Sequence, residues 1–218
     1  RAGPEGHVGL VSYPRSGNSM VRGLLERLTG VLTGSDTRPD FTLSRSLIDY
    51  GMEGEGICDA SVEIVKTHYP ERLGHQAFPV ARALVLVRNP FDAIDSYFNM
   101  ALTNTHNVSL DESNYEVFAE EWRALVAHEI RIWARFYTWW FTQDVPVLAL
   151  RYEDLLCHPE DMLRRIISFL RDVPYDAVEE AAPELWHRAQ DILGIDSRHI
   201  GPYQPRSGGI GKSLRHYS

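Results

Sequence analysis

The chain has 218 residues, a formal net charge of −8 and a hydrophobic content of 44%. This length and this ordinary balance of apolar and charged residues predict a globular protein, which we interpret as one domain over residues 1–218. The acidic balance argues against nucleic acid as a partner, because such binding needs a basic face. No apolar run reaches the roughly 18–20 residues that a transmembrane helix needs, so no transmembrane segment is expected.

Short apolar segments that favour β-strands alternate along the chain with segments of helical apolar spacing. Strands are expected at residues 7–13, 62–66, 82–87 and 145–150. Helices are expected at 19–28, 43–50, 91–100, 115–141, 160–170 and 175–190, with a short helix or turn at 71–78 and a break at Pro183. This alternation predicts an α/β fold: a P-loop-like parallel sheet of about four to five strands with helices on both faces.

Three stretches of the chain lack a regular pattern. Residues 30–60 are rich in Gly, Asp, Ser and Thr, residues 103–113 are polar, and the chain after Gly194 has no periodicity. Long loops in α/β proteins often line the substrate side, so the first two stretches are expected to shape a pocket. The aromatic stripe within 115–141 predicts core packing rather than a cofactor site.

The segment Tyr13-Pro14-Arg15-Ser16-Gly17-Asn18-Ser19 joins the first expected strand to the first expected helix. The first N–H groups of a helix lack internal partners and favour negative charge, and a glycine lets the backbone approach a ligand. Arg15 adds a permanent cation, and its neighbours add hydroxyl and amide groups. Taken alone, the loop fits an anion site and an ordinary turn capped by Asn18 or Ser19 equally well.

Cationic or polar residues follow each of the four expected strands. They are Arg15, Lys66 to His68, Arg88, and Arg151 with Tyr152. Parallel sheets bind ligands at the carboxyl ends of their strands, so these residues are expected at one edge of the sheet. Their convergence favours an anion-binding active site over an ordinary turn.

Two of these strand ends indicate specific chemistry. Arg88 and Ser96 are suited to hold a phosphate through forked and hydroxyl donors; the alternative is a surface cation paired with Asp92. His68, next to Lys66, is suited to general-base work on a hydroxyl or amine, since the ordinary pKa of histidine lies near the operating pH. The alternative is a loop histidine with a structural hydrogen bond.

Other motifs exclude other sites. The only Gly-Lys-Ser tripeptide, Gly211-Lys212-Ser213, is not a Walker A loop, because Arg206 stands where the first glycine is required. No cluster of His, Asp, Glu or Cys has metal-ligand spacing, so no metal is expected. Two cysteines, Cys58 and Cys157, give no disulfide framework. Only two lysines occur in the chain, Lys66 and Lys212.

Taken together and in order, five motifs make the chain resemble a sulfotransferase that uses 3′-phosphoadenosine 5′-phosphosulfate (PAPS). They are the YPRSGNS loop from Tyr13, Lys66-Thr67-His68 with Pro70, Arg88-Asn89 with Asp92 and Ser96, Tyr152-Glu153-Asp154-Leu155, and Arg206-Ser207-Gly208 with Gly211. A weaker resemblance, carried by Thr29-Gly30 and Thr33-Gly34-Ser35, is to the sulfotransferase domain of secretory-pathway WSC-domain proteins.

The resemblance implies a role for each matching residue. The 5′-phosphosulfate would contact the first loop, through Arg15, Ser16, Gly17, Asn18 and Ser19. The 3′-phosphate would contact Arg88, Ser96, Arg206 and Gly208, and Tyr152 would line the nucleotide site near the adenine. Three positions depart from the family: Met20 replaces a tryptophan that stacks on adenine, Ser207 replaces a basic residue, and Arg15 replaces a lysine. The first two bear on nucleotide affinity and the third on leaving-group stabilisation.

The function so implied is transfer of a sulfuryl group from PAPS to a hydroxyl or amine acceptor by in-line displacement. His68 would take the acceptor proton, Lys66 would support the sulfuryl group, and Arg15 would stabilise charge on the leaving oxygen. Two alternatives stay open: a sulfotransferase-like protein that binds nucleotide without efficient catalysis, and a P-loop small-molecule kinase.

The sequence does not specify the acceptor, which is expected to be a small molecule or a glycan. Two cysteines and the absence of a signal-peptide pattern in the first residues favour the cytoplasm. The Asn107-Val108-Ser109 sequon and the WSC-type resemblance leave the Golgi lumen open if a leader or membrane anchor precedes Arg1. Nothing in the sequence indicates an oligomeric state.

Overall fold

The computed structural model describes residues 6–38, 40, 42–70, 75–105, 108–195 and 209–217. At its centre lies a five-stranded sheet with the order β2-β3-β1-β4-β5, in which every pairing is parallel. The strands are β1 His7–Ser12, β2 Gly34–Ser35, β3 Ile64–Thr67, β4 Val80–Val87 and β5 Val147–Arg151. The predicted fold class is therefore confirmed, and β2 is a fifth strand that the apolar pattern did not indicate.

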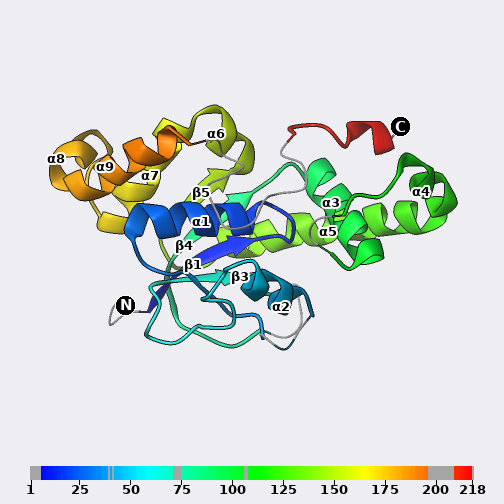
Figure 1. The fold of residues 1–218 in the computed structure, drawn as a ribbon, viewed down its shortest axis with the longest axis horizontal. Coiled ribbons are helices and arrows are strands. Elements are labelled where there is room, and N and C mark those ends of the chain that lie inside the picture. Colours follow the sequence, from blue (N-terminus) through cyan, green and yellow to red (C-terminus); the bar gives the residue numbers. More distant parts are fainter. Residues whose placement is uncertain are drawn as a thin grey trace.

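Helices connect these strands and cover the sheet (Figure 1). They are α1 Asn18–Thr29, α2 Thr42–Asp49, α3 Pro90–Thr103, α4 Glu112–Val117, α5 Ala119–Phe141, α6 Tyr152–Cys157, α7 Pro159–Arg171, α8 Val178–Ala181 and α9 Pro183–Leu193. Short 3₁₀ helices lie at η1 Tyr175–Ala177 and η3 Leu214–Tyr217.

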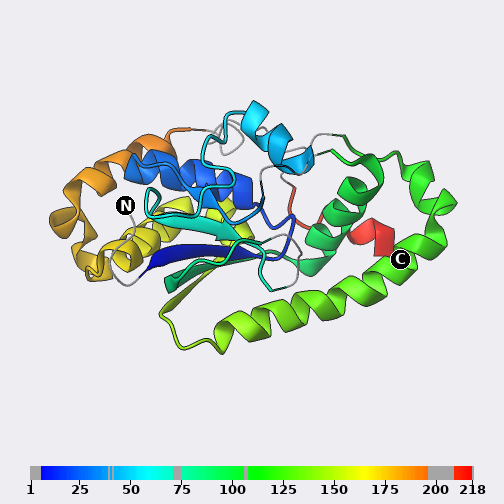
Figure 2. The same ribbon diagram turned by 90° about the horizontal axis from the view of Figure 1, so that it is seen from below.

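The central strands are apolar on both sides because helices cover both faces of the sheet (Figure 2). Leu10 and Leu84 pack into a core with α1, α7 and α9. Val11, Ala83 and Val85 alternate with them and pack into a second core with α3 and α5. Burying a Leu or Val side chain contributes about 1.5–3 kcal/mol, so the two cores fix strand register as well as stability.

Capping residues set the ends of the helices that start at the ligand edge. Gly30 ends α1 in the left-handed region at φ 72°, where glycine is favoured. Pro90 occupies the first turn of α3, and the Asn89 side chain accepts a hydrogen bond from the Phe91 N–H.

One predicted helix is wrong in detail. The segment 115–141 is not one helix, because Phe118 leaves the helical region (φ −107°, ψ 34°) and separates α4 from α5. The shorter helix α4 contacts α3 through the Tyr115 hydroxyl, which donates to Asp95 at 2.5 Å. In the segment 71–78, residues 71–74 lie outside the described residues, and 75–78 form no helix, since His75 pairs in a bridge with Thr37.

Both cysteines, Cys58 and Cys157, are free thiols, in line with the absence of a disulfide framework. Within the part of the chain that the structure describes, no helix is both long and apolar enough to cross a bilayer. The sequon residue Asn107 lies outside the described residues.

Candidate active site

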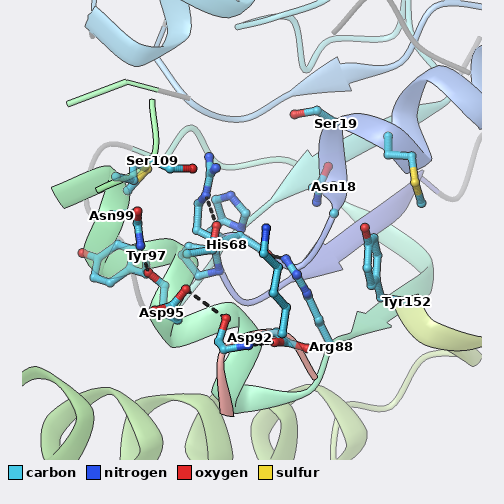
Figure 3. Close-up of a pocket in the computed structure, with 18 of the residues that line it drawn as sticks. Asn18, Ser19, His68, Arg88, Asp92, Asp95, Tyr97, Asn99, Ser109 and Tyr152 are labelled. Carbon is cyan, nitrogen blue, oxygen red and sulfur yellow. Dashed lines mark hydrogen bonds between the residues drawn. The ribbon is translucent and has the colours of Figure 1, made fainter. Parts of the chain in front are cut away.

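A cavity of about 380 Å³ opens at the carboxyl ends of the strands. Figure 3 shows Asn18, Ser19, His68, Arg88 and Tyr152 around it. The predicted site residues that line it are Arg15, Gly17, Asn18, Ser19, Met20, Lys66, His68, Arg88, Ser96 and Tyr152. Residues from four strand ends and from α3 thus meet at one cavity, as the positions of these residues in the chain indicated.

Two groups of predicted site residues are not placed at the cavity. The Ser16 side chain is buried against α5, with its hydroxyl 3.4 Å from the Tyr137 hydroxyl. Arg206, Ser207 and Gly208 lie outside the described residues. Arg151, which also follows a strand, is exposed and pairs with Asp154 at 3.4 Å rather than contributing its charge to the cavity.

The first loop presents an uncapped helix N-terminus to the cavity. Gly17 is the N-cap residue of α1, in the left-handed region at φ 97°, and no side chain caps the helix or places an acidic group in its first turn. The alternative in which Asn18 or Ser19 caps α1 does not hold, because Asn18 is the first helical residue and donates to the Ser12 hydroxyl at 3.0 Å. The free N–H groups and the helix dipole favour an anion here.

Glycine is required at position 17 for a second reason. A Cβ atom on Gly17 would lie 2.5 Å from Cδ2 of Tyr152. The Tyr152 ring therefore packs directly on the loop backbone, and any larger residue would displace one or the other. The loop backbone at Gly17 and the first residue of α6 are therefore in direct contact.

Hydrogen bonds of two arginines connect the loop to α3 and to the end of β4. The Arg15 Nε atom donates to the Ser96 hydroxyl at 3.1 Å, and an Arg88 guanidinium N–H donates to the Arg15 carbonyl at 2.8 Å. Direct hydrogen bonds thus join the residues for which the sequence predicted contacts with the two ends of a nucleotide.

Arg88 is not the surface cation that the alternative reading required. It is 8% exposed, and its guanidinium carbon lies 4.7 Å from the centre of the Tyr152 ring. Its Nε atom has no hydrogen-bond partner among the described residues although it is buried. Burial raises the pKa of Tyr152, while the charge of Arg88 acts in the opposite direction.

His68 is held by the backbone of the neighbouring strand. Its Nδ1 atom lies 2.6 Å from the Ser12 carbonyl oxygen, which can only accept a hydrogen bond. Nδ1 therefore carries the proton in this contact, and the lone pair of the neutral ring lies on Nε2. In this tautomer Nε2 is the basic nitrogen of the ring, and a neutral imidazole is the form that a general base needs.

Lys66 is buried beside His68. Its Nζ atom donates to the Thr37 hydroxyl at 2.9 Å. Burial lowers the pKa of Lys66, and the nearby carboxylates of Glu55 and Asp36 oppose that shift. An additional anion in the cavity would favour the charged form of this lysine.

The aromatic residues of α5 do more than fill the core. The Tyr137 hydroxyl donates to the Leu86 carbonyl at 2.8 Å and accepts from the Tyr13 N–H at 3.3 Å, and burial raises the pKa of Tyr137 to about 12. Trp133 donates to the Arg88 carbonyl at 3.2 Å, and Trp140 donates to the Tyr69 carbonyl at 2.8 Å. The hydroxyl and indole N–H groups of these side chains thus hydrogen-bond to the backbone at three strand ends, a role that helical spacing alone does not reveal.

The segment 209–217 lies against α3 at the rim of the cavity (Figure 1). Asp92 accepts hydrogen bonds from the Gly211 N–H at 2.7 Å and the Ser213 N–H at 3.1 Å, and Asp95 accepts from the Ser213 hydroxyl at 2.9 Å. Lys212 therefore lines the same cavity as Lys66. Asp92 fixes this segment rather than neutralising Arg88, a long-range contact that the local sequence does not show.

Within the part of the chain that the structure describes, no group of three or more His, Cys, Asp or Glu side chains is arranged to hold a metal ion. The polar groups around the cavity are suited instead to an anion, with Arg15, Lys66, Arg88 and Lys212 in its lining.

Comparison with known proteins places residues 67–177 in a match to the model of the sulfotransferase family. The chain is 34% identical over 165 residues to WSCD family member GA21586 of Drosophila pseudoobscura pseudoobscura, covering 74% of this chain and 49% of that protein. It is 32% identical over 204 residues to WSCD family member AAEL009094 of Aedes aegypti, covering 90% and 60%. The chain thus spans about half the length of the curated relatives it matches.

Two solved structures share the fold. Mouse sulfotransferase SULT7A1 complexed with PAP has a TM-score of 0.57 and 15% identity, covering all of this chain and 80% of that one. Retinol dehydratase in complex with androsterone and inactive cofactor PAP has a TM-score of 0.51 and 19% identity, covering 97% and 76%. At these identities the likeness concerns the fold alone.

Proposed function

We propose that this chain, which belongs to the sulfotransferase family, transfers a sulfuryl group from PAPS to a hydroxyl or amine acceptor. One observation carries the proposal: the uncapped N-terminus of α1 and the oriented imidazole of His68 line the same cavity. The first provides an anion site, and the second provides a base beside it.

The residues around the cavity fit the nucleotide. The N–H groups that open α1, together with Arg15 and Ser19, would hold the 5′-phosphosulfate. Arg88 and Ser96 would hold the 3′-phosphate, and the unpartnered Nε atom of Arg88 leaves a buried donor for it. Tyr152 would lie beside the adenine, and Arg206, Ser207 and Gly208, which lie outside the described residues, are proposed to contact the nucleotide. Two proteins of the same fold were solved with PAP, the product of PAPS.

The chemistry at the acceptor follows from the orientation of His68. The acceptor oxygen forms a bond to sulfur as the bond from sulfur to the phosphate oxygen breaks, and the leaving phosphate keeps the electron pair. Nε2 of His68 takes the acceptor proton. Negative charge grows on the leaving oxygen, where Arg15, Lys66 and the helix N-terminus place their donors.

Calorimetry with PAP and a transfer assay with labelled PAPS across phenols, amines, alcohols and sugars test this function. We expect PAP to bind one site and sulfate to reach at least one acceptor class. Failure to bind PAP overturns the proposal. PAP binding without transfer to any class favours a nucleotide-binding protein without catalysis, and magnesium-dependent turnover of ATP favours a kinase.

A further inference from the structure

A histidine and an aspartate outside the predicted motifs form a buried pair next to the strand end that carries His68. Nδ1 of His75 lies 3.0 Å from Oδ2 of Asp36, and the same oxygen accepts a 2.5 Å hydrogen bond from the Thr67 hydroxyl. The Asp36 side chain is 1% exposed and that of His75 is 12% exposed. Because Thr67 directly precedes His68, this hydrogen bond connects the pair to the strand end that carries the proposed base.

Neighbouring contacts fix the position of this pair. Thr37 and His75 form an antiparallel bridge, and the Gln76 N–H donates to the Asp36 carbonyl at 2.8 Å. Lys66, which donates to the Thr37 hydroxyl at 2.9 Å, connects the same network to the cavity lining. The bridge with Thr37 therefore fixes the backbone of His75, and the hydrogen bond to Asp36 fixes its ring.

Two atoms of the pair, Oδ1 of Asp36 and Nε2 of His75, are buried without a hydrogen-bond partner among the described residues. A buried polar atom without a hydrogen-bond partner is unfavourable, so a ligand that satisfies it gains affinity. The Asp36 carboxylate only accepts hydrogen bonds, hence Nδ1 of His75 carries the proton and Nε2 of the neutral ring is an acceptor. His75 lines the cavity that His68 also lines.

We propose that His75 determines acceptor specificity by accepting a hydrogen bond from a hydroxyl or N–H group adjacent to the hydroxyl that reacts. The inference rests on the proposed transfer function and narrows the acceptor to vicinal diols and amino alcohols. An acceptor with a single hydroxyl on an apolar ring leaves Nε2 of His75 unpaired. Asp36 is a positioning residue, because it acts by orienting the His75 ring.

Matched acceptors test the role of His75. Transfer from labelled PAPS is measured to catechol and 2-methoxyphenol, and to methyl β-galactopyranoside and its mono-O-methyl ethers. In at least one set, we expect kcat/KM of the wild-type chain to be at least tenfold higher for the acceptor with the free neighbouring donor. His75→Ala abolishes that preference, His75→Gln keeps part of it through its amide oxygen, and Asp36→Asn weakens it.

Two controls separate specificity from folding. His128→Gln, on the exposed face of α5, keeps the wild-type preference. PAP affinity stays unchanged in all four variants, since none of these side chains belongs to the proposed nucleotide contacts.

A spectroscopic readout does not depend on turnover. Long-range ¹H–¹⁵N spectra of the histidine-labelled PAP complex report the protonation of each ring nitrogen. We expect an unprotonated Nε2 at His75 whose signal moves on addition of catechol and stays in place with 2-methoxyphenol.

The outcomes distinguish this inference from the proposed function. Equal kcat/KM within every matched set in the wild type, or an equal loss for both members in His75→Ala, overturns the role of His75 and leaves transfer intact. A chain that binds PAP but transfers sulfate to no acceptor overturns the proposed function. In that case, a catechol-specific shift at His75 still supports the binding role, and an unmoved signal overturns it.

Discussion

The two ends of the cavity hold their polar groups in different ways. We call the lining residues Arg15, 17–20, Arg88 and Tyr152 the donor end, after the proposed nucleotide site, and we call Thr37, Lys66 and His75, with Asp36 bonded to His75, the acceptor end. At the donor end, backbone geometry supplies the contacts: a left-handed Gly17, an uncapped helix and a carbonyl that accepts from Arg88. At the acceptor end, buried side chains contact each other across three separate segments.

This difference has a consequence for how each end tolerates change. A backbone site depends on φ angles and close approach, so few residues can replace those at the donor end. A side-chain network changes when any one member is replaced, and its specificity then shifts without loss of the fold. We therefore expect nucleotide binding to be the less variable property and acceptor choice the more variable one.

The largest effect is expected where the two ends meet. His68→Ala removes the proposed base, so transfer falls by roughly 10²–10⁴-fold while PAP still binds, because His68 is not among its proposed contacts. Single-turnover rates and calorimetry on the same protein measure the two properties separately. His128→Ala, on the exposed face of α5, is the matched control. Near-normal turnover of His68→Ala would show that another group removes the proton.

The next largest effect is expected at the donor end. Arg88→Gln removes a charged donor from the nucleotide site and the ring contact with Tyr152, so PAP affinity falls roughly tenfold to a hundredfold. Preference between matched acceptors stays as in the wild type. Arg151→Gln, at the exposed end of the next strand, changes neither property. A changed acceptor preference in Arg88→Gln would mean that the two ends are not independent.

The sequence predicted which residues near the start of α1 line the cavity, because the patterns that place them are local. The order of strand, short loop and helix placed Arg15, Gly17 and Ser19 at the sheet edge, and the strand ends placed Arg88 and His68 beside them. The α/β fold was predicted for the same reason, since apolar runs and helical spacing each extend over only a few residues.

Lys66 was predicted at the site and residues 30–60 were expected to shape a pocket, but the contact between Asp36 and His75 could not be predicted, because it joins distant, irregular segments. Asp36 lies in the stretch 30–60, which has no periodicity, and His75 lies within the segment 71–78, for which only a short helix or turn was expected. Nothing within a few residues of either indicates their pairing across 39 positions. The contacts of Asp92 with Gly211 and of Tyr137 with the Leu86 carbonyl were missed on the same grounds.

A smaller effect is expected from the support that α5 gives the donor end. Tyr137→Phe leaves the buried Tyr13 N–H and Leu86 carbonyl without this hydroxyl, so the free energy of unfolding falls by about 1–2 kcal/mol. Denaturant titration measures this loss, and PAP affinity weakens modestly because the loop loses a support. Tyr175→Phe, which removes an exposed hydrogen bond to Asp161, is the matched control with little effect on either property. A loss of acceptor preference with intact PAP binding would contradict the assignment of Tyr137 to the donor end.

The smallest effect is expected on stability at the acceptor end. Burial lowers the pKa of Lys66 below that of an unfolded lysine, so folding disfavours the ammonium form of this side chain. The unfolded state binds more protons between the lowered pKa and the ordinary one, so wild-type stability gains from this group as pH rises through that window.

Lys66→Met should therefore raise the free energy of unfolding by about 1 kcal/mol or less at pH 7, roughly 2–4 °C in Tm at most. This advantage shrinks toward pH 10, while transfer is impaired at every pH. Thermal unfolding of both proteins across this range measures the trend, and an advantage that grows with pH would show that the neighbouring carboxylates outweigh burial at this lysine.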